Sequence, residues 1–365
     1  MSYRNKVIAA ALLSFATLAP ASFASAADLP YKVKAKPVPD VPFFLVIDNR
    51  VTYSYIFTGT DPGVWSVRPD GTLNGNTAKS VYSYTHFDVW AYGTNFFGIN
   101  MFKSDHNDPA GPCSNAGVLL SGVAASCAGA TEFFGLIRST FGWNELFNTK
   151  MFSMGPLHNI SFEVGAEGET ENNFLAPNKR AFEAGLQFAF DLPYKGYFNV
   201  APLAYKEINH NAFDQCGLFG PGIPGVTCIA DGNTDFKTTW AVEINYYMDL
   251  GFLPPEMQYF AISGRAGFYG PKGNQNEPLG VLGGGTATKV EINSEPIRLT
   301  FDASKAIWGA KYSQFVTTWV AYRYWQNKFG LDHNAAPGVC TLNAGTISTN
   351  SCTESTVYAG VTVKF

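Results

Sequence analysis

The sequence predicts an all-β fold, a transmembrane antiparallel up-and-down β-barrel of twelve strands. Three observations predict it: alternating apolar and polar residues, long polar connections after every second segment, and a composition rich in aromatic residues but poor in charge. Charged and aromatic residues each make up 15% of the 365 residues, whereas about 25% charged residues is usual in a soluble domain. Such a chain suits a sheet with one apolar face and one polar face.

Alternation with a period of two residues marks the strands. Even-numbered positions are apolar in Phe182–Phe190, with Glu183 among the residues between them, and again in Trp240–Met248, with Glu243 between them. The phase slips near Pro296, where a β-bulge would restore it. The segments with this pattern are 43–57, 80–92, 94–105, 131–142, 157–169, 179–191, 196–209, 235–249, 256–269, 287–302, 313–328 and 355–365.

The connections between these segments differ in length. The long polar ones are 58–79, 106–130, 170–178, 210–234, 270–286 and 329–354, and the others are mostly short. An even number of strands, with long loops on one side and short turns on the other, is typical of bacterial outer-membrane barrels. A soluble sandwich would also alternate, but it does not explain the unequal connections; a soluble barrel around a ligand is the second alternative. The sequence therefore predicts an integral outer-membrane barrel over residues 43–365.

The amino-terminal segment has the features of a secretory signal peptide. A basic start is followed by the apolar run Val7–Ala19 and by the small residues Ala24-Ser25-Ala26, so we expect residues 1–26 to be cleaved. Residues 27–42 are basic and rich in proline, which predicts a flexible periplasmic lead. The rest of the sequence has no run of the roughly 20 apolar residues that a membrane helix needs.

The last segment, Ser355–Phe365, alternates along its whole length. A terminal segment frays unless it is paired. We therefore expect it to pair with the first strand, near residues 43–57, and so remove both edges of the sheet.

The six cysteines fall in three long loops, two in each. Many pairings are possible for six cysteines, but pairing within a loop does not require separate loops to meet. We therefore predict three loop-local disulfides in an oxidising compartment: Cys113–Cys127, Cys216–Cys228 and Cys340–Cys352. Their spacing matches no zinc pattern, and we predict neither a metal nor a cofactor.

Charge and motifs argue against two classes of function. Without the two basic residues of the leader, the chain has 25 − 2 = 23 basic and 29 acidic residues, a balance of −6. This mild acidity argues against a nucleic-acid partner, which requires a concentrated basic face. The sequence has neither H-E-x-x-H nor G-x-S-x-G. We therefore predict no catalytic residues and no enzyme.

If the apolar faces meet lipid and lipopolysaccharide, the polar faces line the lumen. Side chains of both signs and aromatic rings could then offer weak, repeated sites to a small polar solute. The sequence thus predicts a channel for passive diffusion; the alternative is a closed structural or adhesive barrel that acts through its disulfide-stapled extracellular loops. The predicted lumen residues are His86, Asp88, Arg138, Glu183, Glu243, Asn245, Tyr247, Arg265, Glu291 and Arg323.

Four segments resemble the nucleoside-specific outer-membrane channel family (Tsx-type), and the chain looks like an alphaproteobacterial outer-envelope protein. These segments are Thr85–Ala110, Leu146–Glu169, Thr317–Gly330 and Ser355–Phe365. The resemblance implies a monomeric twelve-stranded barrel with a narrow lumen that passes nucleosides, and a carboxyl-terminal Phe365 that is presented to the barrel assembly machinery. The sequence departs from that family in its longer, cysteine-bearing loops.

Overall fold

The computed structural model describes most of the predicted barrel. The described residues are 42–111, 113–115, 118–119, 129–213, 215–216, 224, 229–273, 289–335, 338–343 and 345–365. The predicted signal peptide and all of the predicted lead except Pro42 lie outside them.

Twelve long strands of the described chain form one closed antiparallel sheet. Each strand pairs with the strands before and after it in the chain, and β19 pairs with β1. This confirms the predicted twelve-stranded up-and-down barrel. The strands are β1 (Phe44–Gly59), β4 (Thr77–Trp90), β5 (Gly93–Ser104), β8 (Thr131–Gly142), β9 (Leu157–Glu171), β10 (Asn178–Leu192), β11 (Gly196–His210), β13 (Thr239–Asp249), β14 (Phe260–Tyr269), β15 (Glu291–Asp302), β16 (Val316–Gln326) and β19 (Thr353–Lys364).

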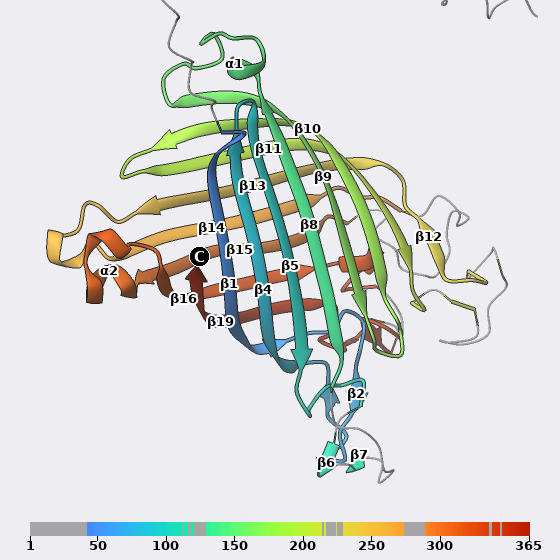
Figure 1. Cartoon of the computed structure of the whole chain (residues 1–365). Helices are drawn as coiled ribbons and strands as arrows, with labels where there is room; N and C mark the ends of the chain where they lie inside the picture. Colours follow the sequence, from blue (N-terminus) through green and yellow to red (C-terminus); the bar gives the residue numbers. More distant parts are fainter. Residues whose placement is uncertain are drawn as a thin grey trace, which may run out of the picture. The chain divides into compact units, whose positions relative to one another are not determined.

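The two ends of the barrel carry different connections. Figure 1 shows α1, α2 and the C terminus at one end, and β2, β6, β7 and β12 at the other. We call the end with the short links periplasmic and the end with the long loops extracellular. The periplasmic links contain α1 (Trp143–Leu146), η1 (Pro255–Met257), α2 (Ala303–Trp308) and η2 (Ala310–Tyr312). The extracellular loops contain β2 (Ser66–Val67), β3 (Leu73–Asn74), β6 (Cys113–Asn115), β7 (Val118–Leu119), β12 (Asn233–Asp235), η3 (Lys328–Gly330), β17 (Thr341–Leu342) and β18 (Ile347–Ser348).

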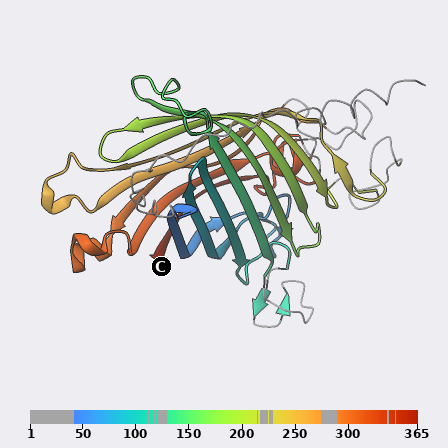
Figure 2. The same cartoon turned by 45° about the horizontal axis from the view of Figure 1, so that its top comes forward.

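The closing seam and the bulge both lie where the sequence predicts them. Pairing between β1 and β19 runs from Arg50 opposite Lys364 to Ile56 opposite Tyr358, and Figure 2 shows the two strands side by side. The register of β15 shifts between Ser294 and Ile297 against β16. Pro296 lies in this shift, because a proline has no N–H to donate to a neighbouring strand.

The outer face of the barrel is apolar and exposed. Its large exposed side chains include Tyr53, Tyr82, Phe97, Ile99, Ile137, Phe162, Phe182, Trp240, Val320 and Val361. A closed sheet satisfies its backbone hydrogen bonds without water, and an apolar outer band then matches lipid. The protein is an integral outer-membrane protein. None of the described helices is long and apolar enough to cross a membrane.

One of the three predicted disulfides lies wholly among the described residues. Cys340 and Cys352 are bonded, with an S–S distance of 1.96 Å, which confirms that pair. Cys216 is also in a disulfide, but its predicted partner Cys228 lies outside the described residues, as does Cys127. The pairs Cys216–Cys228 and Cys113–Cys127 therefore stay predictions.

Candidate functional site in the barrel lumen

Strand register identifies the side chains that share the inner face. Arg138 on β8 lies opposite Gly165 on β9, and Gly165 lies opposite Glu183 on β10. Residues paired in this way point to the same side of a sheet. The predicted residues Arg138, Glu183, Glu243, Asn245, Tyr247, Arg265, Glu291 and Arg323 all lie on this inner face.

Arg138 lies at the centre of the first inner cluster, which crosses the lumen. Its guanidinium donates to both carboxylate oxygens of Glu243, at 3.1 Å from Nε and 2.9 Å from Nη2. Arg138 is on β8 and Glu243 is on β13, and β9, β10 and β11 lie between these two strands on the shorter path around the sheet. Arg138 also pairs with Glu183 and, at 3.6 Å, with Glu167. A Cβ at Gly165 would lie 2.7 Å from Cδ of Arg138, so this glycine leaves room for the cluster.

A second inner cluster surrounds two buried lysines nearer the extracellular end. Lys179 Nζ lies 2.7 Å from Glu167 and 3.6 Å from Glu291. Lys272 pairs with Glu291 at 2.5 Å and with Glu207. Glu167 therefore joins the first cluster to the second, and the predicted residue Glu291 belongs to this connected set.

Two tyrosines line the second cluster. The rings of Tyr205 and Tyr269 lie 4.5 Å apart between centroids. Tyr269 donates from its hydroxyl to Glu243 at 2.9 Å, and Tyr205 donates to Glu207 at 2.8 Å. Lys179 Nζ lies 6.0 Å and 5.8 Å from the two ring centroids, within the range of a cation–π contact. The lumen thus combines charged groups with aromatic faces.

A third inner cluster lies at the extracellular ends of β4, β8, β16 and β19. Lys79 Nζ pairs with Glu132 at 3.1 Å and with Asp61. The predicted residue Arg323 pairs with Glu354 at 2.7 Å. Lone buried charges are costly, and these pairs reduce that cost.

The extracellular loops form an apolar cluster over these charges, which we call the lid. It joins four connections: β1–β4, β9–β10, β11–β13 and β16–β19. Beside it, Lys328 of the β16–β19 loop lies 3.7 Å from Glu169 on β9, on the opposite side of the barrel. The lid residues are Val64, Leu175, Phe213, Phe329, Leu331, Val339, Cys340 and Cys352.

The periplasmic half of the lumen is more open. Asn199 donates to Asn245 at 3.1 Å, and the rings of Tyr197 and Tyr247 stack at 6.2 Å. Arg265 lies opposite Asn245 and is exposed. In the part of the chain that the structure describes, Arg265 has no ion pair. The Tyr247 hydroxyl donates to Asp249 at 2.5 Å and accepts from Gln314 at 3.1 Å.

Two predicted lumen residues, His86 and Asp88, instead lie on the outer face of β4. His86 is opposite Phe97, and Asp88 is opposite Ile47; these apolar partners are 40% and 51% exposed. His86 contacts Asn49 at 2.8 Å and Asp88 at 3.1 Å through its two ring nitrogens. The prediction of lumen positions for His86 and Asp88 is wrong, because the register of β4 turns both side chains outward, where they bond one another and Asn95 bonds Asp88.

Several charged lumen residues were missed by the sequence analysis. In Glu163–Glu171 an acid stands at every second position except Gly165, so the alternation could have revealed these acids. Lys272 and Lys328 lie in loops, where no periodic signal exists. The missed residues are Lys79, Glu132, Glu167, Glu169, Glu171, Lys179, Glu207, Lys272, Lys328 and Glu354.

One group of buried acids has the geometry to hold a metal ion. Asp61, Glu132 and Glu171 can each offer one carboxylate oxygen, and these three atoms lie within 4.8 Å of one another. Hard cations such as Ca²⁺ prefer oxygen ligands of this kind.

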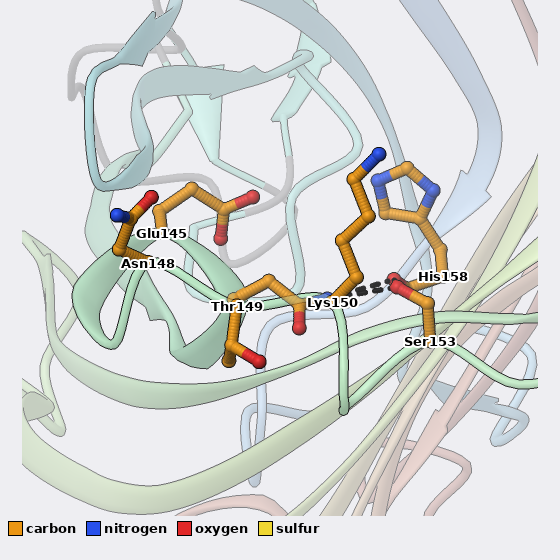
Figure 3. A pocket seen from close by; sticks show the side chains of 7 residues that line it. Glu145, Asn148, Thr149, Lys150, Ser153 and His158 are labelled. Atoms are coloured by element: carbon orange, nitrogen blue, oxygen red, sulfur yellow. Dashed lines mark hydrogen bonds between the residues drawn. The ribbon is translucent and has the colours of Figure 1, made fainter.

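A surface hollow of about 380 Å³ lies on the periplasmic link between β8 and β9 (Figure 3). Ser153 and His158 line it, and His158 Nδ1 lies 3.3 Å from Asp191. A serine nucleophile would need a hydrogen bond to the imidazole. Ser153 instead donates to the backbone carbonyl of His158 at 2.6 Å. This arrangement does not activate the serine.

No known protein family and no curated protein match the sequence. The fold is similar to an outer-membrane channel from Pseudomonas putida F1, with 9% identity over 93% of this chain and 100% of that chain, at a TM-score of 0.39. It is also similar to the translocator domain of the autotransporter NalP from Neisseria meningitidis, with 8% identity over 87% of this chain and 88% of that chain, at a TM-score of 0.36. The P. putida toluene transporter TodX has 8% identity over 89% of this chain and 90% of that chain, at a TM-score of 0.33. These values are low, and the barrel assignment rests on the strand pairing.

Proposed function

We propose that this protein is an outer-membrane channel for the passive diffusion of small polar solutes, with nucleosides as the leading solute class. The observation that carries the proposal is the chemistry of the lumen. Its inner face combines carboxylates, guanidinium and ammonium groups, amides and tyrosine rings, and its periplasmic half has exposed groups.

The periplasmic half suits weak capture of an uncharged solute with an aromatic ring. Tyr197 and Tyr247 offer ring faces on which a nucleobase can stack, and any base can stack in this way. Asn199 and Asn245 lie beside them and can exchange hydrogen bonds with hydroxyl groups. Such sites replace part of the solute's water shell, and weak binding lets the solute leave again.

The extracellular half suits selection. A solute that passes it must move between Arg138 and Glu243, which together cross the lumen. The sugar hydroxyls of a nucleoside can exchange hydrogen bonds with these paired groups, whereas an apolar solute cannot. The lid must then open at the extracellular mouth. The resemblance of four segments to the Tsx-type family also supports the nucleoside class.

Single-channel recording in planar bilayers tests this proposal. We expect the wild-type protein to conduct, and we expect adenosine and thymidine to block part of the current. Tyr247→Ala should weaken the block about tenfold, because stacking of a base on an aromatic ring contributes roughly 1–3 kcal/mol. Tyr246→Ala is the matched control: Tyr246 is the next residue of β13, and its side chain points to the outer face.

Each result separates one part of the proposal from another. No conductance from folded protein would overturn the channel and leave the closed structural or adhesive barrel. Conductance that neither nucleoside blocks would overturn the nucleoside class alone. An equal loss of block in Tyr246→Ala and Tyr247→Ala would contradict the role of the lumen tyrosine.

A further inference from the structure

Three buried acids from separate parts of the chain meet near the extracellular mouth. Asp61 follows the end of β1, Glu132 lies at the start of β8, and Glu171 ends β9. Glu132 and Glu171 are opposite one another in the sheet. One carboxylate oxygen from each of the three acids lies within 4.8 Å of the others.

The neighbouring protein groups do not neutralise these acids. Lys79 contacts Asp61 and Glu132, and its third partner is the carbonyl oxygen of Thr60 at 3.2 Å. Glu171 is only 5% exposed, and its buried carboxylate faces the carboxylate of Asp61, with no donor group beside it among the described residues. Three carboxylates and the one ammonium in contact with them give −3 + 1 = −2. Lys328 and Arg323 also attract Glu132, but they pair with the acids Glu169 and Glu354. Buried charge of this size requires a counter-charge.

We propose that Asp61, Glu132 and Glu171 bind one Ca²⁺ ion. Its charge would balance the group, and its ligand shell would supply the partner that Glu171 lacks. Ca²⁺ takes about six to eight oxygen ligands in flexible geometry, which suits three carboxylates from separate segments whose oxygens lie within 4.8 Å of one another. Mg²⁺ requires near-ideal octahedral geometry and gives up its water reluctantly, so three carboxylates on separate segments favour Ca²⁺. The three carboxylates supply up to six oxygens, and water can complete the shell.

This site would tie the lid to the barrel wall. The backbone carbonyl of Asp61 accepts a hydrogen bond from the N–H of Val64 at 3.0 Å, and Val64 belongs to the lid. An ion bound by Asp61, by Glu132 of β8 and by Glu171 of β9 would therefore connect the β1–β4 loop to two adjacent strands of the barrel wall. The proposal does not depend on which solute passes, or on whether any does.

Calorimetric titration of the purified full chain in detergent tests the site. The protein is first treated with EDTA, freed of it, and then titrated with CaCl₂ or with MgCl₂. We expect one Ca²⁺ per chain and at least tenfold weaker binding of Mg²⁺. Glu171→Gln should weaken Ca²⁺ binding at least tenfold, because it removes a charged ligand and keeps the shape of the side chain.

Glu163→Gln is the matched control, since Glu163 is a buried acid on the same face of β9 and lies outside the group. It should bind Ca²⁺ within about twofold of wild type. Asp61→Asn changes a loop ligand and leaves the strands intact, so it replaces Glu171→Gln if that variant does not assemble. Failure of wild-type protein to bind Ca²⁺ would overturn the proposal and indicate that Asp61 and Glu171 share a proton. Wild-type affinity in Glu171→Gln or Asp61→Asn would also overturn it.

Discussion

The two halves of the lumen are built from the same strands but have different interiors. In the extracellular half, Lys79, Lys179 and Lys272 are almost fully buried, and each pairs with at least two acids. In the periplasmic half, Arg265 and Tyr197 remain exposed. The loops cause this difference. The extracellular loops supply Asp61, Lys272, Lys328 and the lid, whereas the periplasmic link between β15 and β16 supplies Gln314, which bonds Arg50 and Tyr247.

The comparison separates two tasks within one barrel. If the protein is a channel as proposed, the open half can receive a solute, because Arg265 and Tyr197 are exposed there. In such a channel the filled half would select, because a solute there would compete with the existing ion pairs. Removing a charge should therefore affect stability in the filled half and selectivity in the open half.

The largest expected effect comes from Arg138→Met in the filled half. It leaves Glu243 and Glu183 without their cation, and breaking a buried ion pair on one side typically costs about 3–5 kcal/mol. We expect a loss of that size in the free energy of unfolding, measured by guanidinium denaturation of the barrel in lipid. Arg180→Met removes an exposed arginine from the outer face of β10 and should change stability by less than about 0.5 kcal/mol. Equal stability of Arg138→Met and wild type would remove the distinction between the two halves.

The next effect concerns the lid. Phe329 is buried there, and truncation of a buried phenylalanine costs about 3 kcal/mol. Phe329→Ala should therefore raise the open-to-closed ratio in single-channel recordings by roughly 100-fold. The control is Phe174→Ala, since Phe174 lies beside the lid residue Leu175 but is 55% exposed. An unchanged open probability in Phe329→Ala would mean that the lid does not close the mouth.

The smallest effect comes from Arg265→Gln in the open half. A unit charge in water acts with about 1 kcal/mol at 4 Å, so the ratio of cation to anion permeability should rise by about twofold to fivefold. Reversal potentials across a salt gradient measure this ratio. Arg180→Gln removes the same charge outside the lumen and should leave the ratio unchanged. If both variants shift the ratio equally, Arg265 acts through overall charge and not through its place in the lumen.

The sequence predicts the barrel well, because strand alternation and loop length are local properties. The strand number, the closing seam, the bulge at Pro296 and the Cys340–Cys352 bond are all confirmed. The inner positions of Glu183 and Glu243 follow from the same alternation. Apolar neighbours on the same strand identify the face in these cases.

The ion pairs could not be predicted in the same way. Arg138 and Glu243 are 105 residues apart and meet only because the sheet closes around them. Lys272 and Lys328 enter from loops that have no repeating pattern. The predicted lumen positions of His86 and Asp88 are wrong for another reason. A polar residue indicates the inner face only where the outer face is apolar, and near the end of a strand both faces can be polar.

The pairing of β1 with β19 has a consequence for how the protein folds. Thr52 and Thr362 are hydrogen-bonded across this seam although 310 residues separate them. Contacts between such distant residues are slow to form, because the entropy of closing the chain must be overcome first. Until then both strands have free edges that another chain could join. The seam that makes the finished barrel stable in lipid therefore makes its unfinished form prone to aggregation.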